Sequence, residues 1–105
     1  MADYVLLYSG GGMPETEEEQ AKALKAWQDW LSEVGDAVKD EGNPFGPAAK
    51  TIDAGGAVAD ASGSLHTGYS IVKAGSLDEA ATIAKGSPVL QGGGSVTIYE
   101  TFEVM

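Results

Sequence analysis

Residues 67–84 read TGYSIVKAGSLDEAATIA, and this stretch decides the predicted fold. Its first half, 67–74, alternates and is rich in aromatic and β-branched side chains, which is typical of a β-strand. Ser76-x-x-Glu79 then forms a capping box, in which two side chains can satisfy backbone N–H groups at a helix N-terminus. The stretch therefore predicts a strand, a glycine turn and a short helix that ends before Gly86.

The N-terminal part of the chain shows the same order of strand and helix. Residues 4–8, YVLLY, are a short apolar run that predicts a strand buried on both faces. Thr16-x-x-Glu19 is another capping box, and a long amphipathic helix is expected from there to about Gly42. Its apolar stripe comprises Leu24, Trp27, Leu31, Val34 and Val38, widened by Ala23, Ala26, Trp30 and Ala37. Both tryptophans are expected to pack in the core rather than to stack on a ligand.

Two further strands complete the predicted order. Residues 48–52, AAKTI, are one candidate, and residues 95–104 form a long alternating strand after three glycines. In the latter, Val96, Ile98, Phe102 and Val104 are expected to face the helices, and Ser95, Thr97, Tyr99, Thr101 and Glu103 to lie on the opposite face. With right-handed crossovers, this order predicts an α+β domain of ferredoxin-like βαββαβ type, with both helices on one face of a four-stranded antiparallel sheet.

The sheet face opposite the helices needs a cover. The strand over 4–8 is apolar on both faces, and the last strand offers Ser, Thr and Tyr rather than Lys and Glu on its outer side. Monomers rarely expose an apolar patch larger than roughly 300–600 Å² without a use for it. We therefore expect the protein to pair with itself as a homodimer.

Composition bounds the possible partners. The 105 residues suit one domain, 1–105, and the net charge of −10 opposes binding to nucleic acid or to anionic lipid surfaces. The absence of cysteine excludes disulfides and thiol chemistry, and neither a metal site nor a cofactor motif is indicated. No basic segment precedes an apolar run, and no run approaches the roughly 20 residues that span a bilayer, so a cytoplasmic location is the default expectation.

Three segments resemble the YCII-related family: GYSIVKAGSLDEA at 68–80, AKGSPVL at 84–90 and GGGSV at 92–96. The tryptophan-bearing helix that leads to GNPFGP at 42–47 resembles one subgroup of the same family. The resemblance implies a dimeric α+β barrel, in which two ferredoxin-like sheets face each other. In that family the proposed active site is a His/Asp pair with the histidine on the first long helix, and the corresponding helix here contains no histidine.

Two hypotheses for function remain open. In the first, the domain binds a small molecule without catalysis, in a cleft between sheet and helix or at the dimer interface, using Ser95, Thr97 and Tyr99 with Asn43 in its Pro-bounded loop. In the second, it is a small lyase, isomerase or monooxygenase-like enzyme that uses His66, the single histidine, as acid or base with a carboxylate. A His66 beside a carboxylate in a pocket would favour the enzyme, and an exposed His66 would favour binding.

Overall fold

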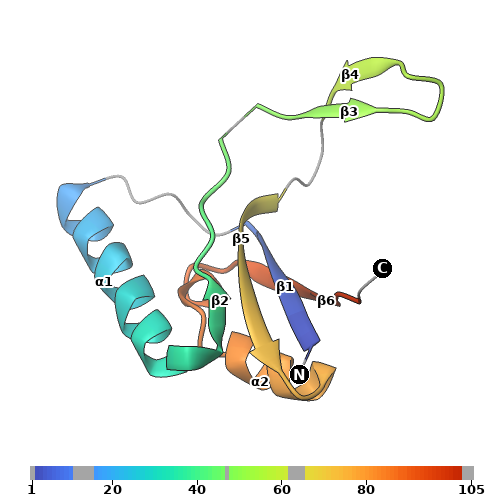
Figure 1. Ribbon diagram of the computed structural model, residues 1–105. Coiled ribbons are helices and arrows are strands. Elements are labelled where there is room, and N and C mark those ends of the chain that lie inside the picture. The colour runs from blue at the N-terminus through green and yellow to red at the C-terminus, as the bar shows by residue number, and fades with distance from the viewer. Residues whose placement is uncertain (1, 11–15, 47, 62–65, 103–105) are drawn as a thin grey trace.

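The sheet is built around its N-terminal strand. The computed structural model describes residues 2–10, 16–46, 48–61 and 66–102. Strand β1 (Ala2–Ser9) lies between β5 (His66–Ala74) and β6 (Ser95–Glu100), and β2 (Val38–Asp40) flanks β5, which gives the order β2-β5-β1-β6 (Figure 1). Every pairing is antiparallel. The predicted α+β fold with a four-stranded antiparallel sheet is confirmed.

Both helices begin at the predicted caps. Helix α1 (Glu17–Val34) follows Thr16, whose hydroxyl accepts the N–H of Glu19, and α2 (Leu77–Ala84) follows Ser76, whose hydroxyl accepts the N–H of Glu79. Three acidic residues occupy the first turn of α1, where they stabilise the positive end of the helix dipole.

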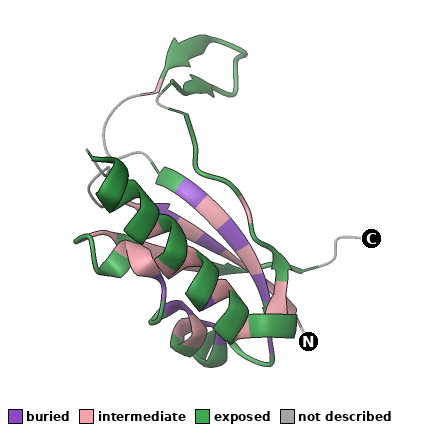
Figure 2. Ribbon diagram, turned by 90° about the vertical axis from the view of Figure 1, so that its left-hand side faces the viewer, coloured by how far each residue is buried: buried purple, intermediate pink, exposed green. Residues whose placement is uncertain are grey.

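The core lies between the helices and one face of the sheet. Alternate residues of β1 (Tyr4, Leu6 and Tyr8) are buried there, together with Trp30, Val72, Ala74, Ala80 and Ala84 (Figure 2). Trp27 packs against this cluster, with its ring edge-on to Tyr8 at 5.1 Å and to Trp30 at 5.7 Å. The core role predicted for both tryptophans is therefore confirmed, whereas Leu24 of the predicted stripe is 60% exposed.

The first helix ends one glycine earlier than predicted. It stops at Val34 because Gly35 takes φ +65°, a conformation that favours glycine, and a 3-10 turn (Gly35–Ala37, η1) leads directly into β2. The prediction that the helix continues through Val38 is wrong, because Val38 is the first residue of the edge strand β2. Gly42 also has a positive φ, +76°, and there the chain passes so close to β5 that a Cβ would lie 1.6 Å from the Tyr69 carbonyl oxygen.

Residues 48–52 do not supply a strand of the main sheet, so that expectation is wrong. They include β3 (Lys50–Ile52), which pairs only with β4 (Val58–Asp60) as a separate two-stranded hairpin. The place expected for this strand in the sheet is taken by β2. In Figure 1 the hairpin stands away from the sheet and helices.

The last strand is shorter than predicted. After the 3-10 turn Pro88–Leu90 (η2), β6 places Val96 and Ile98 against the core as expected, but it ends at Glu100. Phe102 is 84% exposed rather than packed under the helices. Residues 103 and 104 of the predicted strand lie outside the described residues.

Candidate ligand-binding site

The sheet face opposite the helices carries an apolar band. In the strand register, Leu7 lies between Tyr69 and Thr97, and Val5 lies between Ile71 and Tyr99. We call the set Val5, Leu7, Tyr69, Ile71, Tyr99 and Phe45 the open band. The Phe45 ring stacks on Tyr69, with centroids 5.8 Å apart and planes at 20°. Phe45 and Tyr99 are 45% and 56% exposed, so a substantial aromatic surface faces outward within a single chain.

Polar groups flank the open band at both ends. At one end Ser9 Oγ lies 2.9 Å from His66 Nδ1. At the other, Asp3 forms an ion pair with Lys39. Between them the Tyr69 hydroxyl donates a long 3.4 Å hydrogen bond to Asp40 Oδ2. The band is thus apolar at its centre and polar at its ends, as in many protein interfaces.

His66 is exposed and pairs with a serine rather than a carboxylate. Among the described residues, the contacts therefore do not include the pair of His66 and a carboxylate that the enzyme hypothesis requires. Nor do these residues place three His, Cys, Asp or Glu side chains where they could hold a metal ion.

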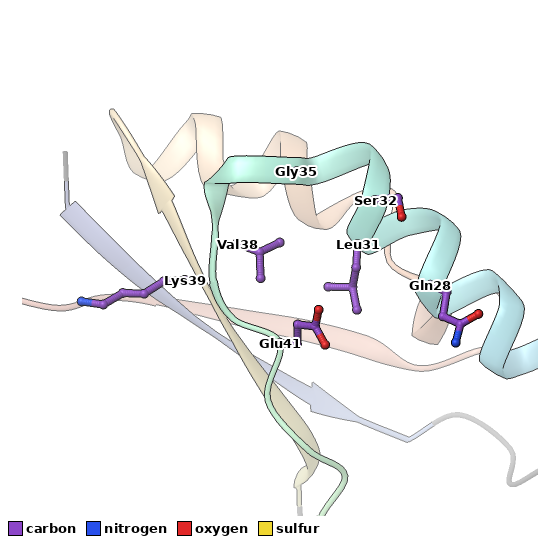
Figure 3. A pocket seen from close by; sticks show the side chains of 7 residues that line it. All are labelled: Gln28, Leu31, Ser32, Gly35, Val38, Lys39 and Glu41. Atoms are coloured by element: carbon purple, nitrogen blue, oxygen red, sulfur yellow. The ribbon is translucent and has the colours of Figure 1, made fainter.

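A groove lies between α1 and the edge strand β2. It has a volume of about 570 Å³ and is lined by Gln28, Leu31, Ser32, Gly35, Val38, Lys39 and Glu41. Figure 3 shows Leu31, Val38 and Glu41 pointing toward one another, while Lys39 points away from them, and its ammonium pairs with Asp3 of β1. The groove therefore has an apolar floor and an acidic wall, and the helix adds Gln28 and Ser32 to its polar rim.

A buried hydrogen-bond chain holds the acidic wall in place. The Tyr8 hydroxyl donates to Ser70 Oγ at 2.7 Å, and the Ser70 hydroxyl donates to the Glu41 carbonyl at 2.8 Å. Burial raises the pKa of Tyr8, and its hydrogen bond to Ser70 opposes that effect. Because Tyr8 and Ser70 are both buried, this chain fixes the backbone at Glu41 relative to the core.

The predicted binding residues do not line the groove. Ser95, Thr97 and Tyr99 form an exposed row on the open face of β6, as their alternation indicated. Asn43 is exposed on the other side of β5, where its carbonyl accepts the N–H of Tyr69 at 3.3 Å. The structure thus groups the three β6 residues and separates Asn43 from them, and their predicted role in binding stays a prediction.

Sequence reasoning missed the groove residues. Gln28, Leu31 and Ser32 are spaced so that they share one side of α1, which was a usable signal. Lys39 and Glu41 were hidden because the helix was expected to continue through them. Once the helix ends at Val34 and turns at Gly35, the segment from Val38 to Glu41 runs beside its last turns and closes the groove.

Comparison with known proteins supports the fold alone. No family model and no curated protein matches the chain. The chain is similar to 5-chloro-2-hydroxyhydroquinone dehydrochlorinase (TftG) from Burkholderia phenoliruptrix, solved in complex with 2,5-dihydroxybenzoquinone. The match has a TM-score of 0.54 and 15% sequence identity, and it covers 94% of this chain and 93% of that one. The chain thus shares an α+β fold, with two helices and an antiparallel sheet, with that protein.

None of the helices in the described part of the chain has both the length and the apolar character needed to span a bilayer.

Proposed function

We propose that the protein is a YCII-related homodimeric domain that binds a small molecule in the groove between α1 and β2. The groove is the observation that carries the proposal. Its volume of about 570 Å³ falls within the roughly 300–1,000 Å³ of typical ligand sites. Like them, it combines apolar side chains with a few polar groups, and the chain Tyr8–Ser70–Glu41 holds one wall rigid.

The lining indicates the chemical class of ligand. Leu31 and Val38 offer an apolar floor, and the Glu41 carboxylate offers hydrogen-bond acceptors on one wall. The Lys39 ammonium is engaged by Asp3, and the net charge of −10 disfavours anions. The groove therefore suits a small ring or short chain that carries a hydroxyl or amine donor. TftG, which has the same fold, was solved with a small ring compound bound.

The open band supports the proposed homodimer. Its aromatic and branched side chains would lose water contact if a second copy placed the same band against it, and burial of apolar surface favours association. A two-fold arrangement would use the same surface on both copies.

The ligand test is a fragment screen monitored by amide chemical shifts. We expect the binding fragments to perturb Leu31, Val38 and Glu41. Ser32→Trp should weaken binding at least about tenfold by occupying the groove, because position 32 is exposed and tolerates a large side chain. Glu33→Trp, at the next exposed helix position but outside the groove, is the matched control. Equal affinity in both variants, or perturbations confined elsewhere, would rule the groove out.

A second candidate, the small lyase, isomerase or monooxygenase-like enzyme, is favoured by the hydrogen bond between His66 and Ser9. Here a ligand on the open face would exchange a proton with the imidazole. The test incubates each binding fragment with the protein and follows conversion by mass spectrometry. Conversion that falls about 100-fold or more in His66→Asn would support it, and binding without conversion would not.

A further inference from the structure

The β3–β4 hairpin is regularly paired, yet among the described residues no strand of the main sheet pairs with it. All six of its strand residues are exposed, although the hairpin is fully paired from Lys50–Asp60 to Ile52–Val58. Its turn is tightly organised, since the Asp53 side chain accepts the N–H groups of Gly55 and Ala57. A two-stranded hairpin alone in water is marginally stable at best. A ribbon this regular therefore requires a surface to pack on.

One face of the ribbon is suited to that contact. Directly paired residues of an antiparallel ribbon share a face, so Ile52 and Val58 point the same way, and they are 66% and 59% exposed. The next pair on this face, Lys50 and Asp60, is neutralised by an ion pair at 2.8 Å. The opposite face presents only Thr51 and Ala59. The ribbon thus has one apolar side with its charges balanced.

The hairpin is rooted at the open band. On its N-terminal side the chain leaves the sheet at Phe45, whose N–H donates to the Thr67 carbonyl and whose ring stacks on Tyr69. On its C-terminal side the chain rejoins the sheet at His66, the first residue of β5. The hairpin is therefore continuous with the surface that the proposed homodimer covers, and it extends beyond that surface (Figure 1).

The open band is too small to make a stable dimer by itself. Stable interfaces bury about 800 Å² per partner and use roughly 20–30 residues on each side. The band has six residues, so further surface must join it. The hairpin is exposed, apolar on one side and adjacent, and in a two-fold dimer each copy would contribute one.

We propose that β3 and β4 form an arm that grips a second copy of this chain, with Ile52 and Val58 packed on the partner's body. This proposal depends on the proposed homodimer and adds a specific contact to it. Its occupant is another copy because the arm is continuous with the self-pairing face. The arm also carries only −1 of the chain's net charge of −10, which limits its repulsion from an acidic partner.

The first experiment measures the dimer dissociation constant by sedimentation equilibrium. Ile52→Thr with Val58→Thr removes the apolar contact but keeps two β-branched residues that favour a strand. We expect its dissociation constant to rise about tenfold or more, since four side chains change in the dimer. Thr51→Ser with Ala59→Ser changes the opposite face of the same ribbon and should stay within about threefold of the wild type.

A deletion makes the result independent of ribbon stability. The N–H of Ala61 donates to the carbonyl of Ala49 at 2.8 Å, so an Asn-Gly turn can join these residues directly and remove the arm. If the wild type is dimeric and the armless protein has the same dissociation constant, the proposed role of the arm is wrong, while the proposed homodimer is retained. A monomeric wild type would overturn both.

Cross-linking identifies the surface that the arm touches. The chain has no cysteine, so Val58→Cys offers a single thiol for a photoreactive label. Labelled protein is mixed with an isotopically heavy, unlabelled copy before irradiation. Cross-links to heavy peptides support the arm on the partner, whereas cross-links confined to light peptides from the same chain would show that the hairpin folds back on its own body and would overturn the proposal.

Discussion

At the scale of single residues, two glycines with positive φ have different roles. Gly35 ends α1 with open space where a Cβ would be, whereas a Cβ on Gly42 would lie 1.6 Å from the Tyr69 carbonyl oxygen. Gly35→Ala should therefore cost only backbone strain, about 1–3 kcal/mol. Gly42→Ala should cost clearly more free energy of unfolding, because β2 must also move away from β5. Urea unfolding of both variants checks this order, and equal losses would contradict it.

Tyr4 should make stability depend on alkaline pH. Its hydroxyl donates to Glu100 Oε1 at 2.7 Å, and this hydrogen bond, with burial and the nearby charges of Glu100 and Glu79, raises the pKa of Tyr4 to about 12. Between about pH 10 and pH 12 the unfolded chain gives up a proton that the folded chain keeps. Its contribution to stability is therefore full below about pH 10 and lost as pH rises through that window.

Comparison with Tyr4→Phe isolates this effect. The variant has no phenolic proton at position 4, so its melting temperature should fall less steeply than that of the wild type between about pH 9 and pH 12. Tyr8, whose pKa is also raised, is present in both proteins. Identical slopes in thermal melts would show that the Tyr4 proton is not linked to folding.

At the scale of elements, two capping hydrogen bonds hold the start of α2, and one of them reaches Gly75, the residue before the N-cap. Ser76 Oγ accepts the N–H of Glu79, and Glu79 Oε2 accepts the N–H of Gly75, both at 3.1 Å. Ser76→Ala should lower the free energy of unfolding by about 1 kcal/mol. Glu79→Gln keeps an acceptor oxygen in place and should cost less than half as much. Chemical denaturation of both variants tests this, and an unaffected Ser76→Ala would mean that packing alone fixes the helix start.

Much of the fold could be predicted because capping and alternation are local signals. Thr16 and Ser76 marked both helix starts, and alternation in 67–74 and 95–104 identified two strands, the second of which ends earlier, at Glu100. The end of α1 could not be chosen from sequence, since Gly35 and Gly42 both qualify as helix stops. The error then displaced β2, because Val38 continues the helical spacing and a three-residue strand has too few residues to show alternation.

The candidate site was less predictable for a related reason. The row Ser95, Thr97 and Tyr99 followed from period-two alternation within one strand. The groove instead depends on how α1 and β2 meet, and it includes Gly35, where the chain turns. Sequence spacing describes one element at a time. A groove between α1 and β2 could be predicted only if the end of the helix and the start of the strand were both predicted correctly.

At the scale of the whole molecule, salt should strengthen the dimer. Each copy carries a net charge of −10, so two copies repel each other as they approach. Raising the ionic strength from about 0.01 M to about 0.15 M shortens the screening length from roughly 30 Å to roughly 8 Å. The dimer dissociation constant should then fall about threefold or more. Sedimentation equilibrium at both salt concentrations measures it, and weaker association at high salt would indicate an interface held by opposite charges.

The central position of β1 has a consequence for synthesis. This strand is made well before both of its partners: Tyr8 pairs with Gly68, and Tyr4 pairs with Glu100. Contacts so distant in sequence form slowly, and until they form an apolar nascent strand has both edges unpaired. The four-stranded sheet therefore cannot be completed on the ribosome until β6 has emerged. A stall or truncation before β6 would release a polypeptide in which the apolar strand β1 still lacks at least one of its two pairing strands.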